Sequence, residues 1–248
     1  MVSYLVRTPI TKKRIRDHFT YSFWKYVLLV VVGVFGWNLI YSVTAYRPPK
    51  DKKVDVYICT SAVESEATDR LAELARPQFP DMEALNFLTI ALGSSDDYYA
   101  NMQLSTYVGA QEGDVYLLPA DRFQAYAQSG LFMPLDEWLA DGVIDARGIE
   151  PGSGRMILRD SDTGAPIDGE VAHVYGLPTE SLYGMFDQGI DNRGLWIGVT
   201  AYSGNPENAA KMVDWLIGEF KTEKPQWLAD YEATQPAPTE LEEVLPSY

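Results

Sequence analysis

The segment from residue 113 to residue 138 predicts a strand, a tight turn and a helix in immediate succession. Residues 115–118 (Val-Tyr-Leu-Leu) form an apolar run long enough for one buried strand. Pro119 ends the run, and Asp121 is expected to cap a helix that Gly130 ends, because glycine tolerates a positive φ. Ligands of open α/β sheets sit at the carboxyl ends of strands, so residues 119–122 are a candidate site.

Two similar strand–helix units precede this segment. Residues 54–59 predict a strand, and Ser61 with Glu64 three positions later forms the Ser-x-x-Glu pattern of a helix capping box. Residues 84–91 predict the next strand, followed by a helix over residues 98–108. The alternation predicts an α/β fold, with a mostly parallel sheet and helices on both of its faces.

The first of these helices and the last long helix each have an apolar face that is expected to be buried. The last helix should begin after Asn205, with Pro206 in its first position. Residues 155–159 and 171–177 can pair as a hairpin, and residues 195–201 predict another strand. The expected buried positions are Ala67, Leu71, Leu74 and Ala75 in the first helix and Ala209, Val213, Leu216 and Phe220 in the last.

An apolar run at residues 26–41 is typical of a membrane-spanning helix. With its flanks it approaches the ~20 residues that a bilayer requires. The basic cluster before it places the N-terminus in the cytoplasm and the C-terminal body outside the cell membrane. A cleaved signal peptide, with residues 43–45 as the small-residue site, is the alternative. The expected divisions are a basic segment (1–22), a single-pass transmembrane helix (23–43), a linker (44–53), one lobe (54–221) and a Pro- and acid-rich tail (222–248).

The charge is distributed unevenly along the chain. The net charge is −15, and residues 54–248 carry 33 acidic and 10 basic residues. So acidic a body argues against nucleic acid or an anionic membrane surface as its partner. It favours a neutral or cationic ligand, or simply solubility. The one cysteine, Cys59, excludes an internal disulfide and is expected to be a buried thiol in the first strand.

Residues 120–123 (Ala-Asp-Arg-Phe) and 126–131 (Tyr-Ala-Gln-Ser-Gly-Leu) form a motif, and residues 174–182 and 198–211 follow it in a consistent order. These stretches resemble the maltose-binding branch of the extracytoplasmic solute-binding proteins of ABC importers. The resemblance implies a periplasmic-binding-protein-like lobe and a sugar ligand.

The resemblance also implies roles for particular residues. Asp121, Arg122 and Glu180 match positions that hydrogen-bond sugar hydroxyls in that family. The alternative is that Asp121 is a helix cap and Arg122 belongs to a surface ion pair. Thr60, Ser61 and Glu64 follow the first strand and are further ligand candidates, although a capping box already explains the last two.

The family's second lobe has no counterpart in this sequence. It would lie between the two later motifs, where only residues 181–197 separate Glu180 from Gly198. A single lobe leaves a ligand exposed, so affinity should be weak or absent, and hinge closure is unavailable.

Neither enzyme activity nor a cofactor is expected. The acidic turn at residues 160–164, with Asp168 and Glu170, fails the calcium-loop pattern because Gly164 and Val171 stand where oxygen ligands belong. His18 and His173 are isolated, and the sequence has no Walker loop and no G-x-S-x-G motif, so no metal site is expected.

Three functions are consistent with these features. The first is a membrane-anchored accessory subunit of a carbohydrate ABC transporter, which would contact integral-membrane transporter subunits. The second is a weak oligosaccharide- or solute-binding protein that acts alone or with a second chain supplying the missing wall. The third is a structural or sensory ectodomain without a ligand.

Overall fold

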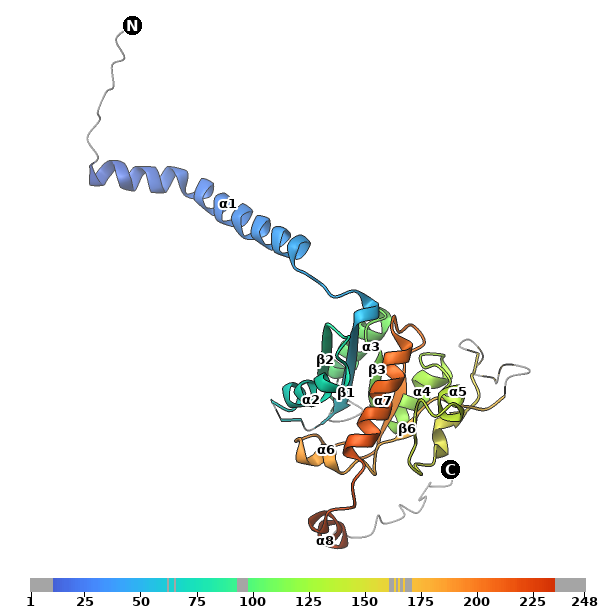
Figure 1. The fold of residues 1–248 in the computed structure, drawn as a ribbon. Coiled ribbons are helices and arrows are strands. Elements are labelled where there is room, and N and C mark those ends of the chain that lie inside the picture. Colours follow the sequence, from blue (N-terminus) through green and yellow to red (C-terminus); the bar gives the residue numbers. More distant parts are fainter. Residues whose placement is uncertain are drawn as a thin grey trace, which may run out of the picture. The chain divides into compact units, whose positions relative to one another are not determined.

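A computed structural model describes residues 11–61, 63, 64, 66–92, 98–160, 163, 165, 167 and 171–234. The expected acidic turn lies partly outside the described residues, and so does the tail beyond residue 234. The chain divides into two compact units, one ending at Arg47 and the other beginning at Pro48 (Figure 1).

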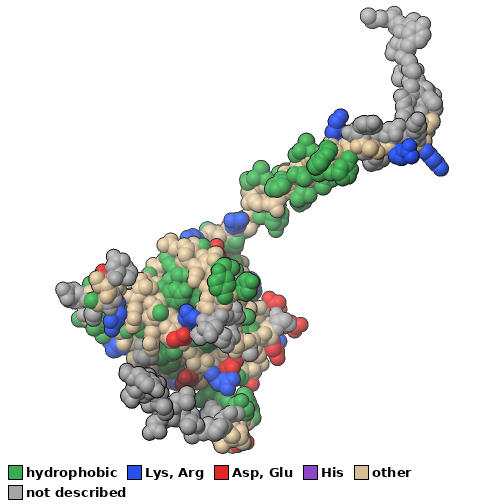
Figure 2. Space-filling view, turned by 180° about the vertical axis from the view of Figure 1, so that it is seen from behind, with side chains coloured by type: hydrophobic (Ala, Val, Ile, Leu, Met, Phe, Trp, Pro, Cys, Tyr) green, Lys and Arg blue, Asp and Glu red, His purple; other side chains and the backbone are tan. Residues whose placement is uncertain are grey.

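The first unit is dominated by the helix α1 (Lys12–Thr44), whose last 23 residues (Ser22–Thr44) are apolar enough in composition to cross a membrane. At 1.5 Å per residue this apolar part is about 35 Å long, enough to cross a bilayer. Hydrophobic side chains cover much of α1 (Figure 2). An N-terminal apolar helix of this kind fits either a membrane anchor or a signal sequence.

The second unit is a five-stranded sheet flanked by helices, as the sequence predicts. The sheet order is β2-β1-β3-β7-β6. Its strands are β1 (Lys53–Thr60), β2 (Ala84–Ala91), β3 (Val115–Pro119), β6 (Leu177–Pro178) and β7 (Leu195–Val199). The strand β1 pairs in parallel with β2 and β3, whereas β7 runs antiparallel to both β3 and β6. The sheet is therefore mostly parallel, with β7 reversed.

Helices cover both faces of this sheet. The helices that the structure describes in the second unit are α2 (Ala67–Ala75), α3 (Tyr98–Gly109), α4 (Ala120–Gln128), α5 (Asp136–Ala140), α6 (Gly184–Asp187), α7 (Pro206–Phe220) and α8 (Gln226–Thr234). The expected hairpin is present but short, with β4 (Arg155–Met156) paired to β5 (His173–Val174). The helix α8 lies within residues 222–248, which the sequence predicted to be a tail.

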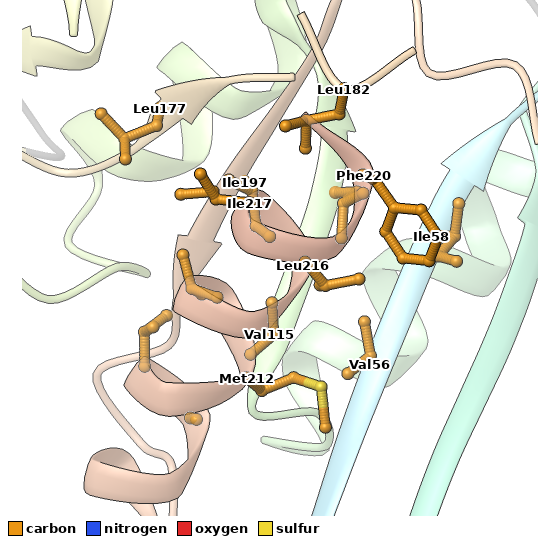
Figure 3. Packing of buried hydrophobic residues seen from close by; sticks show 14 of the residues in the cluster. Val56, Ile58, Val115, Leu177, Leu182, Ile197, Met212, Leu216, Ile217 and Phe220 are labelled. Atoms are coloured by element: carbon orange, nitrogen blue, oxygen red, sulfur yellow. The ribbon is translucent and has the colours of Figure 1, made fainter. Parts of the chain in front are cut away.

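One hydrophobic cluster lies between the sheet and the α2/α7 layer. Figure 3 shows Ile58 and Val115 of the sheet facing Leu216 and Phe220 of α7. The buried face expected for α7 is confirmed at all four positions. In α2 the expected face is confirmed except at Leu74, which is 41% exposed.

A second cluster fills the opposite face, beneath α3 and α4. The ring of Phe123 is stacked on Phe132 with centroids 4.5 Å apart and on Trp196 at 5.9 Å. Gly176 leaves room for this ring, because a Cβ there would lie 2.2 Å from Cζ of Phe123. The motif residue Phe123 is therefore a tightly packed residue of this second cluster.

Cys59 belongs to this second cluster and is fully buried, as expected. Burial raises the pKa of its thiol to about 12. Because the thiolate is the reactive species, we expect the native protein to resist alkylation by maleimides at pH 7 and to react fully in urea. Mass spectrometry would measure the labelled fraction. Rapid labelling of the folded chain would contradict the buried position.

The last long helix, α7, begins after Asn205 with Pro206 in its first position, as predicted, but the caps predicted at Asp121 and at Ser61 are wrong. α4 begins at Ala120 after Pro119, so Asp121 lies inside the first turn and makes no capping hydrogen bond. The amide of Ala120 donates to the carbonyl of Gly194, which fixes this earlier start. Likewise α2 begins only at Ala67, because the backbone at Glu64 pairs with a later loop instead. Gly130, at φ +82°, ends α4 as predicted.

Candidate functional site

The carboxyl edge of the sheet collects every residue singled out from the sequence. β1, β3 and β6 run in the same direction, so their ends lie along one edge. Thr60 is the last residue of β1, and Ser61 and Glu64 follow it. Asp121 and Arg122 follow β3, and Glu180 follows β6. A cavity of about 540 Å³ opens on this edge, beside the end of β1.

Three segments line this cavity, which we name the carboxyl-edge pocket. The segment after β1 contributes Ser61, Val63 and Glu64. The segment from α6 to β7 contributes Phe186 and residues 189–191 and 193, and α8 contributes Trp227, Leu228 and Tyr231. Of the predicted residues, Ser61 and Glu64 line the pocket, whereas Asp121, Arg122 and Glu180 lie elsewhere on the edge.

Glu64 ties the segment after β1 to the loop opposite. Its carboxylate Oε2 accepts a hydrogen bond from Arg70 Nη2 at 2.7 Å, and the same guanidinium nitrogen donates to the carbonyl of Gln188 at 2.7 Å. The amide of Glu64 donates to the carbonyl of Gly189 at 3.0 Å. Gly189 has φ +79°, and a Cβ there would come within 2.6 Å of the Glu64 carboxyl carbon. Only glycine fits this approach.

Thr60 has a structural role in the same wall. Its side chain is nearly buried, and Oγ1 donates to the carbonyl of Asp191 at 2.6 Å. Its hydroxyl hydrogen is therefore already engaged inside the protein. Val63 and Ile190 form an isolated antiparallel bridge that extends the contact.

Asp191 and Arg193 form a two-pronged ion pair at the mouth of the pocket. Arg193 Nε donates to Oδ1 at 2.9 Å and Nη2 donates to Oδ2 at 2.6 Å. The hydrogen bond from Arg193 lowers the pKa of Asp191, so the carboxylate stays ionised at neutral pH. The Arg193 guanidinium carbon also lies 6.0 Å from the centroid of the Phe186 ring.

Aromatic rings form the other wall of the pocket. Trp227 meets Phe186 edge to face, with centroids 5.8 Å apart. Trp227 and Tyr231 stay about half exposed, at 54% and 49%. They lie four positions apart on α8 and so share one face of it, while Leu228 is buried and anchors the helix.

Asp121 and Arg122 lie at the start of α4, away from the pocket lining. Their side chains are 3.8 Å apart (Nε to Oδ2), with that of Asp121 68% exposed. Glu180 is exposed in the turn after β6. The carboxylates of Asp121 and Glu180 are thus exposed, whereas the side chain of Arg122 is 32% exposed and its Nε is buried. None of the three residues lines the pocket beside the aromatic rings.

Phe186, Asp191, Arg193, Trp227 and Tyr231 were missed by sequence reasoning. The i, i+4 spacing of Trp227 and Tyr231 in a stretch taken for a tail was the one available signal. Phe186, Asp191 and Arg193 lie between the motifs, where the family pattern offers no guide.

A second cavity, of about 560 Å³, lies at the amino edge and holds the carboxylates of Asp55 and Asp114. Burial raises the pKa of Asp114, against hydrogen bonds from the Ser203 hydroxyl (2.6 Å) and the Asp55 amide (2.9 Å). Asp55 in turn accepts from Lys53 Nζ and from Asn86 Nδ2. These carboxylates are satisfied within the protein, which indicates a structural role.

The sequence matches no protein-family model and no curated protein. Solved structures do match it. The chain is structurally similar to extracellular solute-binding proteins. One, of family 1 from Alicyclobacillus acidocaldarius, is 21% identical with a TM-score of 0.35, over 53% of this chain and 29% of the other. A second is an ABC substrate-binding protein from Listeria monocytogenes in complex with cycloalternan. It is 23% identical with a TM-score of 0.30, over 51% of this chain and 28% of the other.

A third is the N-glycan transport solute binding protein from Streptococcus pneumoniae. It is 15% identical with a TM-score of 0.33, over 51% of this chain and 24% of the other. The chain thus spans less than a third of the length of each of these proteins. They are of the class that the sequence motifs resemble. The similarity concerns about half of this chain, and their ligands are properties of those proteins.

Proposed function

We propose that the chain is a membrane-anchored, extracytoplasmic solute-binding-like domain that binds a small polyhydroxylated solute, such as a sugar, in the carboxyl-edge pocket. The observation that supports this is that aromatic rings and charged side chains line the same cavity. Sugars present apolar faces to rings and hydroxyls to carboxylates and guanidinium groups. The volume of about 540 Å³ lies in the range of small-molecule sites.

The proposed site uses α8 and the short α6–β7 segment where the larger solute-binding proteins use a second lobe. Trp227 and Tyr231 supply exposed ring faces, and the carboxylate of Glu64 and the Asp191–Arg193 pair supply polar partners. The role we propose does not involve catalysis. Of the described residues, none form a cluster of three or more His, Cys, Asp or Glu side chains arranged to hold a metal ion.

Truncation of Trp227 tests the site. We expect Trp227→Ala to lower the affinity for a bound sugar about tenfold, because ring stacking contributes about 0.5–1.5 kcal/mol beyond the buried area. Calorimetric titration of the purified full chain with maltodextrins and a mixed sugar panel measures this. Tyr99→Ala, an exposed aromatic on α3, is the matched control and should leave the affinity unchanged.

The same titration separates the pocket from the family-like positions. Glu64→Gln is expected to weaken binding, whereas Asp121→Ala and Glu180→Ala should have smaller effects, because neither residue lines the pocket. The opposite pattern would move the site to the start of α4. Absence of saturable heat from a folded wild-type chain would refute sugar binding.

The wider setting that we propose is an accessory role beside a carbohydrate ABC transporter. The apolar helix Ser22–Thr44, with the basic segment before it, supports an anchor with the N-terminus in the cytoplasm. Such an anchor would concentrate the domain near integral-membrane subunits. Purification from native membranes should recover those subunits with the chain, and their repeated absence would argue against this role.

A further inference from the structure

A further cavity, of about 450 Å³, lies beside the short hairpin of β4 and β5. It shares no lining residue with the carboxyl-edge pocket or with the cavity at the amino edge. Its walls come from the segment after α4 (residues 130–134), from the hairpin at Leu158, His173 and Tyr175, and from Ala201. None of the lining residues is an aspartate, glutamate, lysine or arginine. We name this cavity the His173 pocket.

Backbone hydrogen bonds hold the walls of the His173 pocket in place. The amide of Met133 donates to the carbonyl of Val199 at 2.9 Å, which joins the segment after α4 to β7. The amide of Leu135 donates to the carbonyl of Val174 at 2.7 Å, which joins the same segment to β5. The cavity is therefore formed without a ligand, and its volume lies in the range of about 300–1,000 Å³ that is typical of small-molecule sites.

His173 is the accessible polar side chain of this lining. Its side chain is 34% exposed, whereas Tyr175 is 1% exposed. Nδ1 of His173 lies 3.1 Å from Oδ2 of Asp136. An ionised carboxylate only accepts hydrogen bonds, so Nδ1 carries the hydrogen, and in the neutral ring Nε2 is left as an acceptor. Among the described residues, none donates to Nε2.

Asp136 is itself fixed by two further contacts. Oδ2 also accepts from the amide of Val174 at 2.9 Å, and Oδ1 lies 3.6 Å from Nη1 of Arg155. The same nitrogen of Arg155 donates to the carbonyl of Ala172 at 3.2 Å. Neither Asp136 nor Arg155 lines the cavity, so the two charges pair with each other beside it. The fixed carboxylate determines the orientation and the tautomer of the imidazole.

We propose that the His173 pocket binds a small apolar molecule with one hydroxyl group, of which a phenol is the simplest, and that Nε2 of His173 accepts the hydrogen bond from this hydroxyl. The side chains of Phe132, Met133 and Leu158 provide apolar walls for the ligand's ring. A lining without charges favours an uncharged ligand. One accessible hydrogen-bonding side chain suits a single hydroxyl, in contrast to the polyhydroxylated solute proposed for the carboxyl-edge pocket.

Chemical modification of histidine tests this site, because the chain has two histidines. Diethyl pyrocarbonate acylates the unprotonated nitrogen of an imidazole, so a ligand on Nε2 protects the ring. In the detergent-purified full chain, p-cresol should slow the acylation of His173 and leave that of His18, which does not line the pocket, unchanged. The methyl ether of p-cresol cannot donate a hydrogen bond and should protect His173 less. Mass spectrometry of the two peptides measures both rates. Absence of protection, or equal protection by the phenol and its ether, would overturn the proposal.

Removal of the acceptor supplies a second test. In calorimetric titrations the wild-type chain should bind p-cresol about three- to tenfold more tightly than its methyl ether, the range expected for one hydrogen bond. His173→Phe keeps a ring but lacks the acceptor, so the two affinities should become equal. An unchanged melting temperature would show that this variant folds. A preference for p-cresol that survives in the folded variant would contradict the role of Nε2.

Two control variants separate this site from the rest of the molecule. Leu158→Trp places a larger side chain in the cavity and should abolish binding of both compounds, which also gives the background from their partition into detergent. Trp227→Ala, in the carboxyl-edge pocket, should keep the preference for p-cresol. Loss of p-cresol binding in Trp227→Ala but not in Leu158→Trp would place the phenol in the carboxyl-edge pocket and refute the proposal.

Discussion

Replacing Phe123 with alanine is expected to lower the free energy of unfolding by about 3–5 kcal/mol. The ring is fully buried and stacked between Phe132 and Trp196, on the face of the sheet covered by α3 and α4. Gly176 and Gly198 approach it so closely that a Cβ on either would overlap the ring. These rigid backbone contacts cannot collapse into the space left by the ring, so most of the cavity should remain.

Labelling of Cys59 reports this loss directly. The thiol lies in the same cluster as Phe123, so its reaction with maleimide across a urea series follows the opening of that core. Tyr99→Ala removes an aromatic ring of similar size from an exposed position and should change stability by no more than about 0.5 kcal/mol. A loss at Phe123 no larger than this control would mean that the ring does not support the core.

The order of strands and helices in the second unit follows from local patterns in the sequence. β2 begins and ends at the predicted residues, 84 and 91, because its apolar run is bounded on both sides. Gly130 ends α4 with the expected positive φ. These features depend on a few neighbouring residues, which is the range over which propensity and turn chemistry act.

The cap predictions failed because contacts distant in sequence determined the helix starts. Glu64 has the right spacing from Ser61 for a capping box, but its carboxylate pairs with Arg70 and its amide with Gly189. A contact between residues 64 and 189 has no local signature. The antiparallel direction of β7 was also beyond local patterns. The apolar run predicts a strand, but it does not indicate which strands lie beside it or in which direction they run.

The candidate site was predictable as an edge but not as a pocket. The rule that ligand sites follow parallel strands predicted that Thr60 and Asp121 lie at the carboxyl edge, whereas Glu180 was a candidate only through the family resemblance. The rings that form a wall of the pocket come from α6, which is a single short turn, and from α8, which begins directly after Pro225. Whether such segments pack on the sheet depends on tertiary contacts, such as Trp227 against Phe186, that periodicity does not reveal.

The short segment between β6 and β7 is held in place by Thr179 and Asn192. Both side chains are fully buried. Thr179 Oγ1 donates to the carbonyl of Asn192 at 2.9 Å or to that of Leu195 at 3.0 Å. Asn192 Nδ2 donates to the carbonyls of Thr179 and of Leu182, the latter at 3.3 Å. These bonds join the end of β6 to the start of β7, so the intervening segment forms a fixed loop.

Asn192→Ala is therefore expected to cost about 1–3 kcal/mol, because it removes two buried hydrogen bonds, from Nδ2 to the carbonyls of Thr179 and Leu182, each worth about 0.5–1.5 kcal/mol. Both carbonyls keep a backbone donor, the amides of Leu182 and Met185 respectively. The variant should also bind the proposed ligand less tightly, since the freed loop carries Phe186 and Asp191 of the carboxyl-edge pocket. Urea unfolding followed by Cys59 labelling measures the first effect, and calorimetric titration of the folded fraction measures the second.

Asn192→Asp separates loss of the donor from loss of shape. The new carboxylate would be buried against two carbonyl oxygens, so at neutral pH it should destabilise the chain more than alanine does. Burial would raise the pKa of that carboxyl above its unfolded value, and its protonated form can donate one hydrogen bond. Stability relative to the wild-type chain should then recover as the pH falls through that raised pKa, whereas the alanine variant should show no such recovery. If both variants were as stable as the wild type at every pH, the loop would be held by its apolar contacts, with Leu182, Met185 and Ile190 as the anchors to test next.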